Sequence, residues 1–308
     1  MSKKRNLKIL KRSIIVSSII GLLLIHFFIP RLITEIRNPI VGLIKRNKPV
    51  EVEFKEGTDT TSNRKEFVFK SFDDIKLSAY LTKSKTETPK GTIILLHGIR
   101  SNKNHFLGLS TFLAENGYNS VALDLRAHGD SEGQFCTFGV FEKKDVQKLV
   151  DYLIDQEKLK NIGVWGQSLG GAVAIQSMGF DKRISFGVIE STFTDYQTIV
   201  NDYFDLHAGF SFLPFSNYLS GRAADIAEFD ADDAKPIKYC KNINQPILIV
   251  HGNKDKRINI SYGKANFSTI KSPQKKFLEI DNANHLNVWK VGGDKYFKEV
   301  LSFLDNRQ

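Results

Sequence analysis

Cysteine is scarce in this chain, with only two in 308 residues. Cys136 and Cys240 lie far apart, and neither belongs to a CxxC pair or a metal-like cluster, which argues against a cysteine-ligated metal site. Because no cysteine precedes Cys136, the chain also lacks the residue that a lipoprotein anchor near its N-terminus would need. Two isolated thiols are therefore expected, with a disulfide as the alternative if the domain lies outside the cytoplasm.

Other recurrent signatures are missing as well. The chain has no internal repeat, no low-complexity tract, no dinucleotide-binding fingerprint after a strand and no nucleic-acid-binding motif. Its formal net charge of +10 would suit nucleic acid, but it would also suit an anionic membrane surface. Since the basic residues crowd the N-terminus and are scattered elsewhere, we expect no nucleic-acid partner, no metal and no cofactor.

The N-terminus has the pattern of a membrane signal. A basic tail at 1–12 precedes an apolar run at 13–30, and the 17 residues 13–29 carry no formal charge. At about 1.5 Å per residue they reach the lower limit for spanning a bilayer. We predict a single-pass transmembrane signal anchor, with a cytoplasmic N-terminus and the rest of the chain outside the cytoplasm. A cleaved signal peptide is the main alternative, although no A-x-A-like site is visible.

The rest of the chain divides into a linker at 31–63 and one domain at 64–308. Two segments flanking Phe72-Asp73-Asp74 predict an antiparallel hairpin, after which short apolar strands alternate with helical segments. This order predicts an α/β fold with a mostly parallel central sheet and helices on both faces. We expect further strands at 92–96, 120–123, 161–165, 184–189, 246–250 and 276–280, and helices at 106–116, 141–156, 169–178 and 296–304.

One segment breaks this alternation. Residues 192–243 contain no clear strand and are rich in aromatic side chains, among them Tyr196, Tyr203, Phe204, Phe210, Phe212, Phe215 and Tyr218. We expect a small helical cap inserted between two strands. The aromatic residues either contact a substrate or pack the core of the cap itself, and the sequence leaves both interpretations open.

The chemistry centres on the pentapeptide Gly166-Gln167-Ser168-Leu169-Gly170. G-x-S-x-G occurs by chance, but here it ends a predicted buried strand and opens a predicted helix, as a nucleophile elbow requires. The glycines allow a sharp turn that raises the serine above the edge of the sheet. Ser168 is therefore the candidate nucleophile, and a buried structural serine is the alternative.

A serine hydroxyl needs a base, and the base needs an orienting acid. In this architecture both follow the serine, in the order acid and then His. His285 lies in the loop after the last predicted strand and is the candidate base, whereas His251 ends a strand and His207 lies in the cap. Asp255 follows the preceding strand and is the candidate acid. Glu190 and Asp195, one strand earlier, are the competing acids.

An oxyanion hole would be built from backbone N–H groups. One donor is expected from Leu169, directly after the nucleophile. The second is expected from the loop after the strand 92–96, with Ile99 first and Arg100 second. A further loop at 124–131 lies on the same edge, where its charges are expected to hold the loop together and His128 is a candidate substrate contact.

These motifs together resemble the α/β-hydrolase superfamily. The residues that carry the resemblance are His97-Gly98, Asp124-x-Arg126-x-x-Gly129-x-Ser131, Gly166-x-Ser168-x-Gly170, His251-Gly252-x-x-Asp255 and His285. Their order and spacing are similar to its monoacylglycerol-lipase and serine-aminopeptidase branch, including membrane-anchored bacterial members, over about residues 64–305. The chain lacks the glycine that often precedes the histidine in this branch. The resemblance implies the fold and the triad, but it leaves the substrate open.

The sequence therefore predicts a serine hydrolase that cleaves carboxylic esters or lipid acyl bonds through an acyl-enzyme. A serine peptidase or an acyltransferase with the same triad is the first alternative. A membrane-tethered binding protein without catalysis is the second. The oligomeric state is not predicted.

Overall fold

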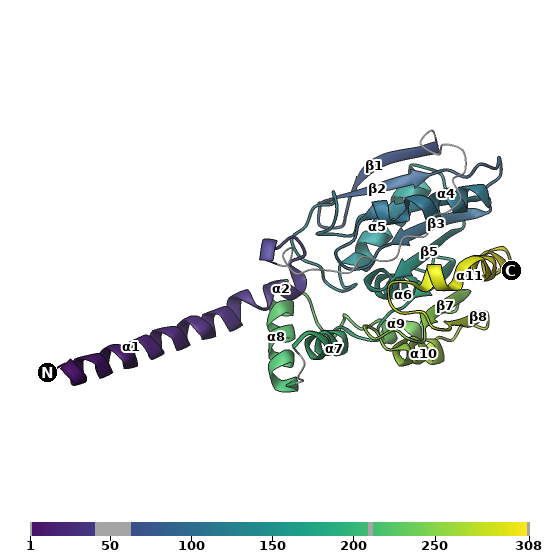
Figure 1. Cartoon of the computed structure of the whole chain (residues 1–308). Coiled ribbons are helices and arrows are strands. Elements are labelled where there is room, and N and C mark those ends of the chain that lie inside the picture. The colour runs from purple at the N-terminus through teal and green to yellow at the C-terminus, as the bar shows by residue number, and fades with distance from the viewer. Residues whose placement is uncertain (1, 41–62, 209–211, 307–308) are drawn as a thin grey trace.

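The computed structural model describes residues 2–40, 63–208 and 212–306. Most of the predicted linker, at 41–62, lies outside the described residues, as does Phe210 of the predicted cap. The remaining elements form one central sheet with helices on both faces, from which a long N-terminal helix projects (Figure 1).

The sheet has eight strands in the order β1-β2-β4-β3-β5-β6-β7-β8. The first pairings, β1 with β2 and β2 with β4, are antiparallel, and all later ones are parallel. Parallel strands are covered on both faces, which explains their continuous apolar runs. The strands span β1 Arg64–Lys70, β2 Lys76–Thr82, β3 Gly91–Leu96, β4 Tyr118–Leu123, β5 Ile162–Gln167, β6 Phe186–Glu190, β7 Ile247–Gly252 and β8 Lys275–Ile280.

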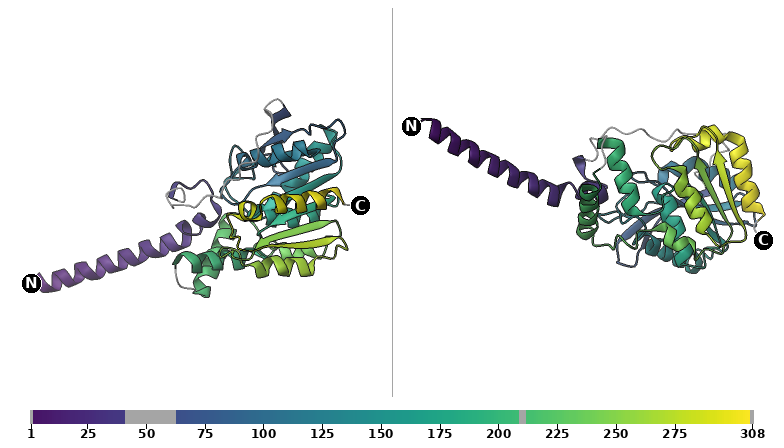
Figure 2. Two further views of the ribbon diagram at one scale, coloured as in Figure 1. Left: turned by 45° about the vertical axis from the view of Figure 1, so that its right-hand side comes forward. Right: turned by 90° about the horizontal axis from the view of Figure 1, so that it is seen from below.

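Alternate side chains of the inner strands enter two hydrophobic cores, one on each face. Leu95 and Val188 pack in the core that includes α4 and α11, while Ile94 and Ile189 pack in the core that includes α5 and α6. Figure 2 shows these helices on opposite sides of the sheet. The predicted fold class is thereby confirmed. The helices span α4 Leu107–Glu115 after η3 Lys103–Phe106, α5 Glu142–Asp155, α6 Leu169–Phe180, α10 Ile260–Thr269 and α11 Val288–Asp305.

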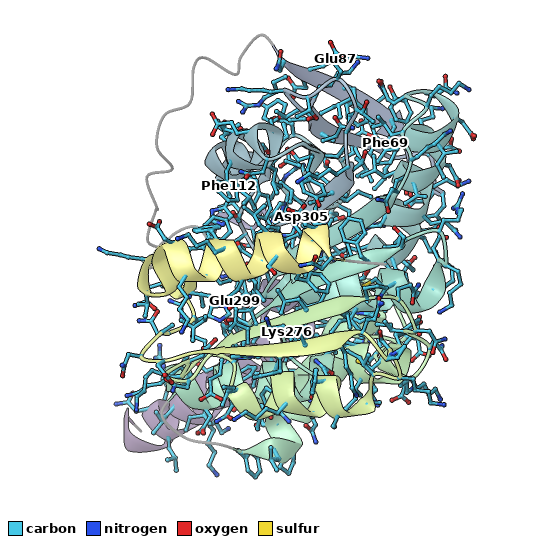
Figure 3. All side chains as sticks on the ribbon, turned by 90° about the vertical axis from the view of Figure 1, so that its right-hand side faces the viewer. Phe69, Glu87, Phe112, Lys276, Glu299 and Asp305 are labelled. Atoms are coloured by element: carbon cyan, nitrogen blue, oxygen red, sulfur yellow. The ribbon has the colours of Figure 1, made fainter. Side chains whose placement is uncertain are left out.

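The last helix begins earlier than the sequence predicts. The sequence predicts a helix only at 296–304, but α11 starts at Val288 and kinks at Gly293 (φ 51°, ψ −149°). The kink lets the first turn pack Trp289 into the core while the rest follows the sheet. An ion pair of 2.5 Å between Lys276 and Glu299 links β8 to this helix (Figure 3).

Three helices lie between β6 and β7, where the cap is predicted: α7 Tyr196–Ala208, α8 Leu213–Ile226 and α9 Pro236–Cys240. The aromatic residues of these helices differ in burial. Tyr196 is fully buried and stacks obliquely on Phe138, whereas Phe212 and Tyr218 are exposed. Tyr196 therefore packs in the core, whereas substrate contact by the exposed cap aromatics stays a prediction. Cys136 and Cys240 are buried free thiols, as the sequence favoured.

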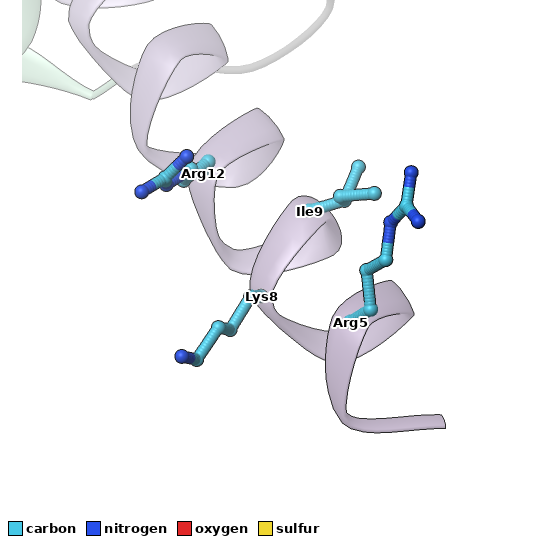
Figure 4. Close-up of a pocket in the computed structure, with 4 residues that line it drawn as sticks. All are labelled: Arg5, Lys8, Ile9 and Arg12. Atoms are coloured by element: carbon cyan, nitrogen blue, oxygen red, sulfur yellow. The ribbon is translucent and has the colours of Figure 1, made fainter. Parts of the chain in front are cut away.

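The N-terminal helix α1 (Ser2–Leu23) runs on through η1 (Leu24–Phe28) to α2 (Arg31–Thr34). The helical stretch Arg5–Thr34 is long enough to cross a membrane and contains an 18-residue window with a mean hydropathy of 2.3. Figures 1 and 2 show α1 projecting away from the sheet. At its start Lys8 and Arg12 lie on one side of the helix and Arg5 lies beside Ile9 (Figure 4).

The structure describes the start of the predicted linker, residues 31–40. Arg31–Thr34 is helical, and this segment packs on the domain. Glu35 forms a β-bridge with Phe135, and the Cys136 N–H donates to Thr34 O at 2.8 Å. Pairing of the backbone with the loop after β4, which the sequence pattern does not reveal, holds the segment in place.

Candidate active site

The pentapeptide around Ser168 forms a tight turn between β5 and α6. Ser168 has φ 54° and ψ −115°, a left-handed backbone conformation that non-glycine residues rarely adopt. The flanking glycines make room for it. A Cβ on Gly166 would lie 2.1 Å from the carbonyl oxygen of Gly170, and one on Gly170 would lie 1.9 Å from that of Leu96.

Gly170→Ala should consequently be severely destabilising, because a methyl group would collide with backbone of β3 rather than with a movable side chain. We expect a loss of about 3 kcal/mol or more in the free energy of unfolding, the upper range for overpacking. Gly221→Ala in α8 is the matched control, since no atom lies within 4 Å of the added Cβ. It should stabilise the helix by roughly 0.5–1 kcal/mol. Chemical denaturation measures both, and equal effects would contradict the steric argument.

Three predicted residues meet above this turn. His285 Nε2 lies 3.1 Å from Ser168 Oγ, and His285 Nδ1 lies 2.8 Å from Asp255 Oδ2. The carboxylate next to Nδ1 favours the tautomer with its proton there, so Nε2 has a lone pair that accepts from the serine hydroxyl. His285 follows β8, Asp255 follows β7 and Ser168 follows β5, and these parallel strands all end at one edge of the sheet.

The predicted oxyanion donors also lie at this edge. Leu169 begins α6, and the first N–H groups of a helix have no partner within it. The loop after β3 passes beside the nucleophile, because a Cβ on Gly98 would lie 3.5 Å from Ser168 Cβ. Ile99 follows directly in this loop, half-buried.

Known proteins share this architecture. A family model described as serine aminopeptidase, S33, matches residues 87–204. The α/β-hydrolase domain-containing protein WAV2 of Arabidopsis thaliana is 28% identical over 249 residues, which cover 76% of each chain. A solved esterase of Pyrococcus furiosus is 25% identical and matches with a TM-score of 0.67, covering 85% of this chain and 98% of its own. The chain belongs to the α/β-hydrolase superfamily.

Another relative of this chain is named for a different activity. A protein named acyl transferase from Photobacterium phosphoreum is 24% identical over 217 residues, which cover 66% of this chain and 70% of its own length. The superfamily resemblance stated from the sequence is thus confirmed. The relatives' names differ in reaction, so the comparisons support a hydrolase-like enzyme without selecting the bond it acts on.

The loop after β7 stabilises the ionised form of Asp255. Its Oδ1 accepts from the N–H groups of Arg257 and Ile258, both at 2.9 Å. Burial alone would raise the pKa of Asp255, but the nearby His251 ring and hydrogen bonds from His285 and the Ile258 N–H outweigh burial and hold the pKa well below its usual range. An ionised carboxylate behind His285 is the form that would stabilise an imidazolium.

The two competing acids, Asp195 and Glu190, accept hydrogen bonds from groups other than His285. Asp195 precedes α7, where its Oδ1 accepts from the Thr198 N–H at 2.8 Å. Glu190 is buried and accepts from indole and amide N–H groups of Trp165, Trp289 and Gln167 and from the hydroxyl of Tyr296. Burial raises the pKa of Glu190 despite these donors. Among the described residues, the carboxylate that contacts the His285 ring is that of Asp255.

The role of Glu190 in the site was missed by sequence reasoning. Its backbone O accepts from the Ser168 N–H at 2.9 Å, and its side chain links Gln167 of the turn to Trp289, which follows His285 in α11. This carboxylate therefore joins the segments that carry the candidate nucleophile and base. Its partners Trp165, Trp289 and Tyr296 lie far apart in the sequence, so no local pattern indicates that they contact one carboxylate.

His97 holds the loop after β3, which carries the candidate oxyanion donor Ile99. Its Nδ1 lies 2.8 Å from Gly98 O, and its Nε2 accepts from the Leu125 N–H at 3.2 Å. Burial, assisted by nearby His128, lowers the pKa of His97 to about 3, so the ring is neutral at pH 7 and can make both contacts. The histidine of the His97-Gly98 motif thus joins the loop after β3 to the loop after β4.

The loop at 124–131 is held by charge, as predicted. Asp124 accepts from the backbone N–H and the Nζ of buried Lys103, at 2.6 and 2.8 Å. Arg126 forms an ion pair of 2.6 Å with Asp145. His128 donates from Nδ1 to Arg126 O at 2.8 Å and is buried. No described contact joins His128 to Ser168 or His285.

Two other histidines follow the candidate nucleophile in sequence. His251 is fully buried, with Nε2 2.9 Å from Ile258 O, so it supports the loop that carries Asp255. His207 belongs to α7. Across the described residues, no group of three or more His, Cys, Asp or Glu side chains has the arrangement of a metal site.

Proposed function

We propose that the protein is a serine hydrolase that cleaves carboxylic ester or lipid acyl bonds through an acyl-enzyme on Ser168. The observation that carries the proposal is the hydrogen-bonded series of Ser168, His285 and Asp255, with Ser168 in a left-handed turn at the start of α6. An unactivated hydroxyl is a weak nucleophile, and this arrangement is what activates one.

In the proposed reaction Ser168 Oγ attacks the acyl carbon while His285 Nε2 takes its proton. Asp255 stabilises the resulting imidazolium. The N–H groups of Leu169 and Ile99 donate to the oxyanion of the tetrahedral intermediate, helped by the positive end of the α6 dipole. His285 then protonates the leaving alcohol. Water, activated by the same histidine, releases the acid and restores the serine.

The substrate class is tested with the purified full chain in neutral detergent. We expect hydrolysis of p-nitrophenyl esters, little hydrolysis of matched p-nitroanilides, and covalent labelling by a fluorophosphonate probe at Ser168. Faster cleavage of the anilides than of the esters would overturn the ester assignment and favour a peptidase. Absence of labelling on folded protein would overturn the acyl-enzyme.

An acyltransferase is the second candidate, favoured by the relative named for that activity. Both reactions share the acyl-enzyme and differ in what attacks it. Adding increasing glycerol to the ester assay separates them. A hydrolase should release acid in proportion to ester consumed, whereas a transferase should convert a rising fraction into glycerol ester, which chromatography of the products measures.

We further propose that the N-terminal helix is a retained single-pass anchor with the catalytic domain outside the cytoplasm. Most of its apolar side chains are exposed, including Ile15 and Leu22, which water would not favour. The basic residues at its start are typical of a cytoplasmic end. Protease added to intact cells should remove the domain and leave a short N-terminal fragment in the membrane. Cleavage only after lysis would overturn the orientation.

A further inference from the structure

A small polar pocket lies where the end of the N-terminal helix meets the domain. Its volume is ≈ 320 Å³, and its lining includes Arg37, Asn38, Arg100, Asn102, His128 and Gly129. Arg100 donates to Leu32 O at 3.2 Å, which fixes the pocket beside α2. None of Ser168, Asp255 and His285 lines it, so this is a separate site from the one described above.

Arg37 supplies an oriented positive charge to this pocket. Its Nη2 donates to the carbonyl oxygens of His128 at 3.3 Å, Gly129 at 2.8 Å and Ser131. Carbonyl groups position a guanidinium without forming an ion pair with it. The charge of Arg37 does act on the exposed Asp130, but that carboxylate is paired with Lys103. Among the residues that the structure describes, no ion pair includes Arg37, although the neighbouring Arg31 pairs with Glu35. A second guanidinium, that of Arg100, lines the same pocket.

His128 supplies a buried acceptor. Its Nδ1 donates to Arg126 O, so the neutral ring keeps a lone pair on Nε2, and this atom is buried with no hydrogen-bond partner in the described structure. Burial lowers the pKa of His128 to about 4, with Arg37 and Arg100 acting in the same direction and the hydrogen bond to Arg126 O opposing them. The ring is therefore neutral at pH 7, and a buried acceptor without a donor is unfavourable.

The guanidinium groups and His128 Nε2 together require a ligand that has both an anionic group and a hydrogen-bond donor. Guanidinium groups prefer oxyanions, and phosphate above all, because several N–H donors face several oxygens. The free Nε2 of His128 requires a donor such as a hydroxyl group. A phosphate ester of a polyol contains both, whereas a simple carboxylate or a choline phosphate has no hydroxyl donor.

The position of the pocket indicates where this ligand comes from. Arg37 lies three residues beyond the last turn of the apolar stretch Arg5–Thr34. The headgroup layer extends about 5–8 Å beyond the hydrocarbon on each side of a bilayer. We propose that this pocket binds the polyol-phosphate headgroup of a membrane lipid, with Arg37 and Arg100 on the phosphate and His128 Nε2 accepting from a headgroup hydroxyl. The proposal rests on the proposed membrane anchor and not on the hydrolytic reaction.

The test is calorimetric titration of the full chain, in the Ser168→Ala background and in neutral maltoside detergent. Dihexanoyl phosphatidylglycerol, below its critical micelle concentration, should bind, and the choline analogue should bind at least about tenfold more weakly, as expected for a lost hydrogen bond and an added cation. Arg37→Gln and Arg100→Gln should each weaken binding about tenfold or more, because each removes a charge-assisted hydrogen bond. Arg31→Gln is the matched control and should stay within about twofold, since an exposed charge contributes little.

Two further arms test the hydroxyl and the source. Dihexanoyl phosphatidylmethanol keeps the charge without the hydroxyl, so it should bind more weakly than the glycerol lipid, and His128→Leu should abolish that difference. Glycerol 3-phosphate and inorganic phosphate should bind more weakly than the lipid. Equal binding of glycerol 3-phosphate would overturn the membrane source. Unchanged lipid affinity in folded Arg37→Gln and Arg100→Gln, or an equal loss in Arg31→Gln, would overturn the site.

Failure of this proposal is distinguishable from failure of the proposed function. Binding is measured without the candidate nucleophile, so it does not depend on hydrolysis. Fluorophosphonate labelling of Arg37→Gln with an intact Ser168 reports on the catalytic series alone. If the protein is labelled but shows no lipid preference, only the proposed headgroup site is overturned. If it is not labelled but still binds the lipid, only the proposed hydrolase activity is overturned.

Discussion

Ser168→Ala is expected to reduce kcat/KM for p-nitrophenyl ester hydrolysis by roughly a million-fold, as loss of the nucleophile does in enzymes whose triad acts as a unit. The hydroxyl has no substitute at this position, because Ser168 Oγ alone lies within 3.1 Å of His285 Nε2 among the described hydrogen bonds. Fluorophosphonate labelling should disappear in the same variant. Intact-protein mass spectrometry and steady-state kinetics measure the two effects.

Ser191→Ala is the matched control for that variant. Ser191 follows β6 near the same edge of the sheet, is buried, and has a hydroxyl without a hydrogen-bond partner in the described structure. Its removal should leave kcat/KM within about twofold, the range of a substitution away from any special contact. If Ser168→Ala kept more than a few per cent of the activity of Ser191→Ala, Ser168 could not be the nucleophile.

Asp255→Asn is expected to lower kcat about ten-thousand-fold while KM changes little, the loss that follows when the base is held in the wrong tautomer. An amide cannot neutralise the imidazolium that forms when His285 takes the serine proton. Its NH2 group would also place a donor where His285 Nδ1 now donates at 2.8 Å. Fluorophosphonate labelling should slow in proportion to kcat.

Asp195→Asn and Asp281→Asn separate this role from a general loss of charge. Asp195 is the competing acid, and Asp281 is an exposed carboxylate after β8 that accepts from Asn253 at 2.8 Å. Both variants should keep kcat within a few-fold. A large loss in Asp195→Asn beside a small loss in Asp255→Asn would transfer the acid role to Asp195.

The same carboxylate should contribute to the pH dependence of stability. The pKa of folded Asp255 lies below its unfolded value of about 3.9, so its ionisation stabilises the folded state above that pH. This contribution is present at neutral pH and is lost as the pH falls below about 4 toward the folded pKa. The difference in free energy of unfolding between the native protein and Asp255→Asn should therefore shrink from pH 7 to pH 3, as urea denaturation at each pH measures. A constant difference would contradict the assignment.

Much of the site could be predicted because its residues stand at strand ends. A parallel sheet brings the carboxyl ends of its strands to one edge, so Ser168 after β5, Asp255 after β7 and His285 after β8 were expected to meet. The apolar runs of the strands and the glycines around Ser168 carry this information locally. The elements 141–156 and 169–178 were placed to within two residues for the same reason, since their periodicity is set by their own side chains.

Other features required the folded chain. The hydrogen-bond partners of Glu190 lie in β5 and α11, up to about a hundred positions from it in the sequence. No local sequence pattern indicates these contacts. The segment 31–40 resembles a linker in sequence, yet backbone pairing with Phe135 and carbonyl contacts of Arg37 attach it to the domain.

The sequence by itself determined the fold class, the elbow and the order of its candidate acid and base, because these depend on periodicity and on which residues follow which strand. Only the tertiary structure showed which candidate acid lies beside the candidate base, by placing the Asp255 carboxylate 2.8 Å from His285 Nδ1 and enclosing that of Glu190 among other donors. It also decided that Arg37, Arg100 and His128 share a pocket. Distances between side chains on separate loops depend on how those loops pack, and packing is a property of the whole chain.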